Sequence, residues 1–130
     1  MRGLVGDIGG TNVRLALCEV TESGITLDNI QSFSTSDYRD LKTVVDVYLA
    51  DHDDPEFGAF AVAAPTNGLS AKLTNANWTA DVQNFAFPCR LLNDLQAAGW
   101  GVSIQSENTL LHQGWHESNR KRLSVIIGVG

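Results

Sequence analysis

The chain has 130 residues, and 15 acidic against 9 basic side chains give a formal net charge of −6 at pH 7. With 43% hydrophobic residues, it is long and apolar enough for one folded domain, which argues against intrinsic disorder. The acidic balance also argues against a nucleic-acid partner, because the basic cluster Arg120–Arg122 is too short for the many phosphate contacts that such binding requires.

The sequence gives no sign of a membrane or secreted protein. Its longest apolar runs are interrupted well before the roughly 20 residues that a spanning helix needs. Met1 and Arg2 lead directly into a strand-like segment instead of a signal peptide, so we expect a cytoplasmic location and no membrane partner. Cys18 and Cys89 are the only cysteines and lie far apart, which indicates core residues and neither a disulfide framework nor a zinc site.

The N-terminal segment predicts a three-stranded antiparallel meander. Strands are expected over 2–8 and 13–20, joined by the short connection Gly9–Asn12. Two glycines that are able to adopt positive φ favour a hairpin here over a crossover into a helix. A third strand is expected over 26–34.

The hydrophobic period then changes from that of a strand to that of a helix. Apolar residues at positions 41, 44, 45 and 48 predict an amphipathic helix over 40–51, with Ser36 or Asp37 as its N-cap. The continuous apolar run over 57–63 predicts a buried parallel strand that is reached by a crossover from this helix.

The remaining segments continue the alternation of helices and strands. We expect a short edge strand over 71–74, a brief helix from Thr79 to Phe85, a buried strand over 89–92, a helix from Asp94 to about Gly99 and a strand over 123–127. This order predicts an α/β domain with a mixed sheet. Because the chain stops on Gly128-Val129-Gly130 directly after a strand, we expect it to be the first part of a longer protein.

The strongest candidate site is the segment Gly6–Arg14, with the sequence GDIGGTNVR. Gly9 and Gly10 would allow backbone N–H groups to approach phosphate oxygens, Thr11 adds a hydroxyl donor, and Asp7 can hold Mg²⁺ directly or through water. The segment is neither a P-loop nor a dinucleotide-binding fingerprint. The alternative is an ordinary hairpin turn with Asp7 as a local hydrogen-bond acceptor.

A second candidate is the pair Asn93-Asp94, at the carboxyl end of a predicted buried strand. Ligands of open α/β sheets bind at such strand ends. Asp94 can accept a proton from a substrate hydroxyl, and Asn93 offers both a donor and an acceptor to a sugar. The alternative is that Asp94 only caps the helix that follows.

Two polar loops form the third candidate. The segments Ala64–Gly68 and Thr74–Trp78 combine threonine, asparagine and tryptophan side chains. This composition is typical of a surface that binds carbohydrate, but turns use the same residues.

Taken in order, the motifs GDIGGTNVRLALC, AVAAPTNG, LTNANW, LLND and IIGVG resemble the N-terminal half of bacterial glucokinases, in the superfamily of sugar kinases, actin and the Hsp70 chaperones. The resemblance covers essentially the whole chain. It implies an actin-like ATPase (RNase H-like) domain of α/β class over residues 1–130, with a mixed β-sheet, an N-terminal antiparallel meander and helices on both faces. It also implies that a C-terminal domain is absent from this chain.

The resemblance further implies ATP- and Mg²⁺-dependent phosphorylation of glucose at its 6-hydroxyl. The ATP-binding turn would consist of Gly6, Asp7, Ile8, Gly9, Gly10 and Thr11. Within it Asp7 would orient Mg²⁺, most simply through water. Asn93 and Asp94 would bind glucose, and Asp94 would be the general base. The chain departs from the family pattern directly after Asp94, where Leu95-Gln96 replaces the frequent Phe-Thr.

Glucose, ATP and the missing domain are therefore the expected partners, and the isolated chain is expected to be nearly inactive. One alternative is a non-enzymatic sugar-sensing or regulatory domain, although related repressors carry an N-terminal helix-turn-helix that Met1 does not leave room for here. Another is a self-assembling half-domain, a homodimer formed through apolar residues that a truncated sheet face would expose.

Overall fold

The structure, a computed structural model, describes residues 1–98. Its elements are β1 (Arg2–Ile8), β2 (Asn12–Thr21), β3 (Gly24–Ser34), the 3₁₀ helix η1 (Thr35–Asp37), α1 (Leu41–Leu49), β4 (Phe57–Val62), β5 (Ser70–Lys72), β6 (Thr79–Asp81) and β7 (Cys89–Asn93). Residues 94–98 are also helical. The strand expected over 123–127 and the terminal Gly128–Gly130 lie outside the described residues.

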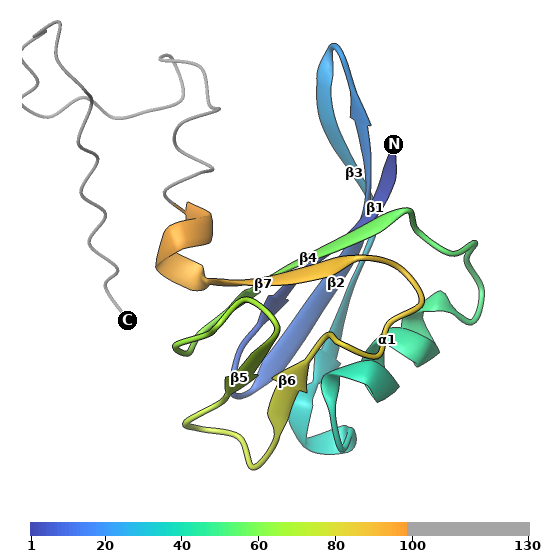
Figure 1. Cartoon of the computed structure of the whole chain (residues 1–130). Coiled ribbons are helices and arrows are strands. Elements are labelled where there is room, and N and C mark those ends of the chain that lie inside the picture. The colour runs from blue at the N-terminus through green and yellow to red at the C-terminus, as the bar shows by residue number, and fades with distance from the viewer. Residues whose placement is uncertain (99–130) are drawn as a thin grey trace, which may run out of the picture. The chain divides into compact units, whose positions relative to one another are not determined.

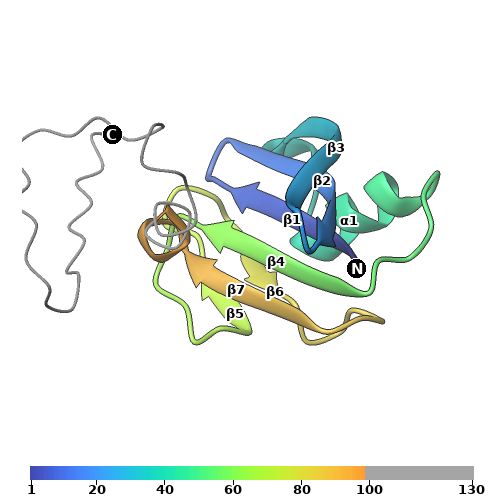
Figure 2. The ribbon, with the colours of Figure 1, turned by 90° about the horizontal axis from the view of Figure 1, so that it is seen from above.

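A five-stranded sheet with the strand order β3-β2-β1-β4-β7 forms the framework (Figures 1 and 2). β2 pairs antiparallel with both β1 and β3, whereas β4 runs parallel to β1, and β7 runs parallel to β4. The predicted meander, the parallel strand over 57–63, the strand over 89–92 and the mixed sheet are therefore confirmed. The tip of the β2–β3 hairpin projects beyond the rest of the sheet (Figure 1).

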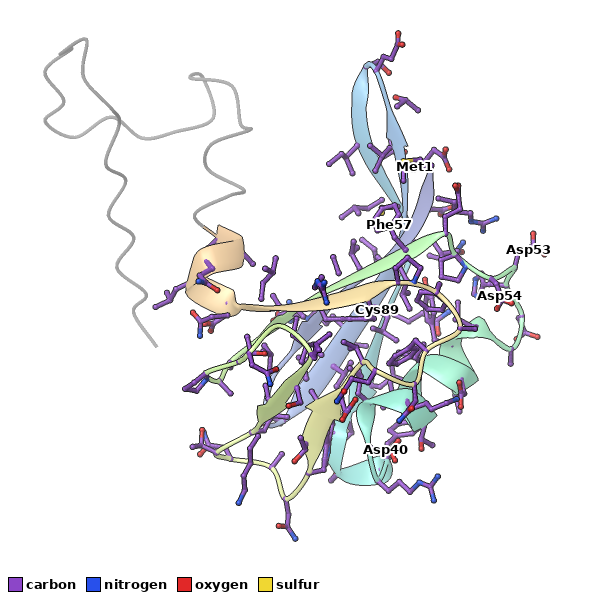
Figure 3. All side chains as sticks on the ribbon, in the orientation of Figure 1. Met1, Asp40, Asp53, Asp54, Phe57 and Cys89 are labelled. Carbon is purple, nitrogen blue, oxygen red and sulfur yellow. The ribbon has the colours of Figure 1, made fainter. Side chains whose placement is uncertain are left out.

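The cap of α1 differs from the prediction. Its N-cap is Asp40, whose carboxylate accepts hydrogen bonds from the Thr43 amide at 2.8 Å and the Thr43 hydroxyl at 2.7 Å. The expected caps Ser36 and Asp37 are wrong because both belong to the separate turn η1. Asp40 stands at the start of α1 in Figure 3, and the hydrogen bonds from Thr43 lower the pKa of its carboxyl group.

A strand replaces the helix that was predicted from Thr79 to Phe85. β6 pairs antiparallel with β5, and the amide of Val82 continues the pairing by donating to the carbonyl of Leu69 at 3.0 Å. Ala80 and Val82 are buried at alternate positions, which is the period of a strand. The expected edge strand over 71–74 occurs as β5, but in this separate two-stranded sheet.

One face of the five-stranded sheet shares a hydrophobic core with α1 and the β5–β6 pair. Its largest fully buried side chains include Phe60, Leu4, Ile8, Leu15, Leu41 and Leu91. Cys18 and Cys89 are buried, as predicted. Within residues 1–98, no helix is long and apolar enough to cross a membrane.

Candidate functional site

The parallel strands β1, β4 and β7 end side by side at one edge of the sheet. Ile8, Val62 and Asn93 occupy neighbouring register positions there. Because adjacent strands are about 4.8 Å apart, the ends of β1 and β7 are separated by only about 10 Å. The turn after β1, the loop after β4 and the Asn93-Asp94 pair thus leave the sheet at the same edge, which is where open α/β sheets bind ligands.

The turn between β1 and β2 is a tight hairpin, as predicted. The amide of Gly9 donates to the carbonyl of Asn12 at 2.9 Å, which closes the turn. Thr35, which lies outside the turn in the sequence, makes two hydrogen bonds to it. Its amide donates to the Thr11 carbonyl at 2.9 Å, and its hydroxyl donates to the Gly9 carbonyl at 3.1 Å.

Gly9 and Gly10 do not adopt the positive φ that was expected of them in this turn. The glycines with positive φ in the described residues are Gly24 and Gly68, so neither Gly9 nor Gly10 uses the left-handed region. A Cβ on Gly10 would lie 2.8 Å from the Cβ of Asn75. Gly10 is therefore needed for the close approach of the loop over residues 74–78 to the turn.

Asp7 is exposed near the end of β1, in register with Arg14 on β2 and Ala61 on β4. Its carboxylate adjoins the turn and offers the hard oxygen ligand that Mg²⁺ prefers. Residues 1–98 contain no group of three side chains that could enclose a metal ion. A single carboxylate fits Mg²⁺, because this ion keeps several waters and takes other ligands from substrate phosphates.

Asn93 and Asp94 are both half-buried at the end of β7. The Asn93 side-chain amide donates to the carbonyl of Ala64 at 3.2 Å, which ties β7 to the loop after β4. Asp94 opens the helical residues 94–98, as predicted. The pair therefore occupies the predicted position between a strand end and a helix start.

The two polar loops behave differently from each other. In the first, the Thr66 hydroxyl donates to the carbonyl of Ser70 at 2.8 Å, and the Asn67 side chain accepts from the amides of Leu69 and Ser70 at 3.0 and 2.9 Å. Both side chains thus build the turn itself, which was the alternative left open for them.

In the second loop, Asn75 and Asn77 are exposed, and the indole N–H of Trp78 donates to the Thr35 carbonyl at 3.4 Å. Thr35, which contacts both this loop and the turn after β1, was not among the candidate residues predicted from the sequence. Its hydroxyl partner is 26 positions away in the sequence and its indole partner 43, so no local pattern could have indicated it.

The glucokinase family model matches residues 4–130. The chain belongs to the glucokinase family. It is 34% identical over 133 residues to the glucokinase of Erwinia tasmaniensis and 33% identical to that of Citrobacter koseri, with 98% of this chain and 41% of the relative covered in both cases. This glucokinase-family chain thus spans about two-fifths of the length of these relatives.

Solved structures agree with the family assignment. A glucokinase from an Antarctic psychrotroph matches with a TM-score of 0.73 at 29% identity, over 82% of this chain and 36% of that one. A glucokinase of the ROK family from Streptomyces griseus, solved in complex with glucose and AMPPNP, has a TM-score of 0.57 at 22% identity, over 78% of this chain and 36% of that one, and shows the fold alone. The α/β fold of actin-like ATPase type is confirmed.

Proposed function

We propose that this chain supplies the phosphate-binding turn and the catalytic base of an ATP-dependent glucokinase. The observation that supports the proposal most is that, in a member of the glucokinase family, the Gly9–Thr11 turn and the Asn93-Asp94 pair leave the sheet at one edge. A phosphate donor and a hydroxyl acceptor bound there would lie within reach of each other, and such positioning accounts for much of phosphoryl-transfer catalysis.

The nucleotide would bind at the turn. The proposed binding residues are Gly6, Asp7, Ile8, Gly9, Gly10 and Thr11. Backbone N–H groups and the Thr11 hydroxyl are donors of the kind that stabilise phosphate oxygens, and the absence of a side chain on Gly9 leaves the backbone accessible. Bound Mg²⁺ would neutralise charge on the phosphates, and Asp7 would orient the ion through a water molecule.

The sugar would bind at the end of β7. Asn93 is held by its hydrogen bond to Ala64, with a carbonyl oxygen suited to accept from a glucose hydroxyl. Asp94 would take the proton of the 6-hydroxyl as that oxygen forms a bond to the γ-phosphorus. The bond from phosphorus to the bridging oxygen breaks, and the products are glucose 6-phosphate and ADP.

We further propose that residues 1–130 act as a single N-terminal domain in the cytoplasm. A second domain would complete the adenosine and sugar sites, which fits a chain that covers 41% of its relatives. Its partners would then be glucose, ATP and that domain, with no nucleic acid and no membrane involved. The isolated chain is expected to have little activity.

The test is glucose-dependent ADP formation with ATP and Mg²⁺, measured on this chain and on a version extended to the end of its reading frame. Turnover in the longer protein alone would support both the kinase proposal and the need for a second domain. Absence of turnover in both, with glucose and with other hexoses, would overturn the enzyme proposal and favour a sugar-sensing role.

Self-association is the second candidate, and β3 is the observation that favours it. β3 is an edge strand of the sheet, and Ile25, Leu27 and Ile30 on it are 56, 56 and 66% exposed. Long edge strands with exposed apolar side chains tend to pair with another chain. Light scattering would give the mass in solution. A monomeric mass for the unsubstituted chain, the same as for Leu27→Lys, would argue against a homodimer.

A further inference from the structure

Thr35 is the buried polar side chain of the core in residues 1–98, and it is 1% exposed. It follows β3 directly and opens η1. Its amide and its hydroxyl each donate to a carbonyl of the turn, those of Thr11 and Gly9. A hydroxyl buried without a partner would be costly, so these contacts also explain why a polar side chain is tolerated at this position.

The hydrogen bond from the Thr35 hydroxyl to the Gly9 carbonyl determines the orientation of the peptide group between Gly9 and Gly10. Residues 1–98 contain no cis peptide bond, and in a trans peptide the C=O and the N–H point in opposite directions. Because the Gly9 carbonyl faces the Thr35 hydroxyl, the Gly10 N–H of the same peptide group points away from Thr35. Rotation of this peptide would break the hydrogen bond at 3.1 Å.

Thr35 also connects the turn to a second segment. Its carbonyl accepts from the indole of Trp78 at 3.4 Å, while Gly10 packs closely against Asn75. The turn is therefore fixed on one side by Thr35 and on another by the loop over residues 74–78, and Thr35 contacts both.

We propose that Thr35 is a positioning residue, whose hydroxyl fixes the turn so that the Gly10 N–H faces a nucleotide phosphate oxygen. This inference rests on the proposed kinase function. Thr35 would act through Gly9 without touching the substrate, since its side chain is buried and its hydroxyl donates to the Gly9 carbonyl. It lies outside the motifs that resemble the glucokinase family.

The anchoring step can be tested on the 130-residue chain by amide hydrogen exchange. Thr35→Val removes the hydroxyl at nearly constant volume, so the turn can open without breaking the hydrogen bond to the Gly9 carbonyl. The Gly9 amide, which closes the turn, should therefore exchange about tenfold faster, the equivalent of one lost hydrogen bond. Thr35→Ser keeps the hydroxyl and should restore protection. Thr43→Val, which removes a hydroxyl on α1, is the matched control, and exchange at Leu15 in β2 corrects for any change in overall stability.

The phosphate step is tested in the extended protein by steady-state kinetics. Thr35→Val should raise the KM for ATP by about tenfold, since one donor to phosphate is no longer held in place, and should leave the KM for glucose within about twofold. Thr35→Ser should behave as the unsubstituted protein. If Thr35→Val only destabilised the fold, it would instead lower the amount of active enzyme and leave the KM values for ATP and for glucose unchanged relative to each other.

The outcomes separate the two proposals. Unchanged Gly9 exchange in Thr35→Val would overturn the anchoring role, whatever the protein catalyses. Faster exchange with an unchanged KM for ATP would overturn the link to phosphate binding while the kinase proposal stands. If the unsubstituted extended protein forms no ADP with any hexose, the proposed function fails and the phosphate role fails with it, although the exchange result still decides the anchoring.

Discussion

Asp94 is the residue on which the proposed chemistry depends most. A general base must be ionised, close to the proton that it accepts and held in a fixed direction. Asp94 lies at the junction of a strand and a helix, and the neighbouring Asn93 is fixed to the loop after β4. Backbone held by regular structure on both sides limits the directions that the carboxylate can take.

Replacement of Asp94 by asparagine should remove most turnover of the extended protein. The amide has nearly the same shape but cannot take the proton, so we expect kcat to fall by about 100-fold or more, with glucose binding largely retained. Kinetics and calorimetric titration with glucose would measure the two effects. Asp54→Asn, on the exposed loop between α1 and β4 (Figure 3), is the control and should change neither. Turnover of Asp94→Asn close to that of the unsubstituted protein would refute the assignment.

Among the elements, α1 shows how a helix start is decided by backbone conformation. Ser36, Asp37 and Asp40 are all chemically able to cap it, and the sequence does not distinguish them. Asp40 has the extended φ of −161° and ψ of 169° that a cap requires, whereas Asp37 lies inside a 3₁₀ turn. The helix itself was predictable from its apolar period, but its first residue was not.

The cap should contribute pH-dependent stability. Thr43 lowers the pKa of Asp40 in the folded protein, so the stabilisation is present above the usual carboxyl pKa of about 4 and is lost as the pH falls through the lowered value. Asp40→Ala should cost about 1 kcal/mol at pH 7 in urea unfolding. The difference should shrink in acid, below about pH 4. Asp37→Ala should be close to neutral, and an Asp40→Ala effect that is independent of pH would contradict this explanation.

The strand β6 could not be predicted from local signals. Thr79 is a plausible helix cap, and only the buried alternation of Ala80 and Val82 favours a strand. The pairing with β5, which only six residues separate from β6 in the sequence, provides the hydrogen bonds that a short isolated strand lacks. Tertiary context overrides local preference in this case.

The packing of β4 against β7 depends on the absence of a side chain at Gly58. A Cβ there would lie 2.6 Å from the Sγ of Cys89, its register partner on β7. Gly58→Ala should therefore destabilise the protein by about 1–3 kcal/mol. In a protein that carries Cys89→Ala, the sulfur is absent, and Gly58→Ala should lower the free energy of unfolding by less. Urea unfolding of the two single variants and the double variant measures the coupling, and strictly additive effects would mean that the sulfur is not what excludes the methyl group.

At the scale of the whole molecule, some residues of the candidate site can be identified from short sequence motifs, whereas others come together only when the chain folds. The candidate residues Gly6–Thr11, Asn93 and Asp94 could be found from the sequence because each motif is short and contiguous. The mixed sheet was predicted, but not the strand order β1-β4-β7 that brings the end of β1 close to the end of β7. Thr35 and the contact of Gly10 with Asn75 could not be found, because they join segments that are adjacent only after folding.

The two cysteines allow a test of whether this unit unfolds as a whole. Cys18 lies in β2, next to the edge strand β3, Cys89 lies in β7, and both belong to the compact unit Met1–Asp94. Burial raises the pKa of Cys18 and raises that of Cys89 to about 11, so at pH 8 neither thiol should form the reactive thiolate in the folded state.

Labelling with iodoacetamide at increasing urea concentration, followed by peptide mass spectrometry, should therefore show no modification of the native chain. Both cysteines should then react over one transition, with the same midpoint as the loss of far-UV circular dichroism, because a compact unit of this size unfolds cooperatively. The variants Cys18→Ser and Cys89→Ser confirm which thiol reacts. Modification of Cys89 at lower urea than Cys18 would instead mean that β7 opens by itself. Asn93 and Asp94 would then be joined to the proposed phosphate-binding turn less firmly than the register of β1, β4 and β7 implies.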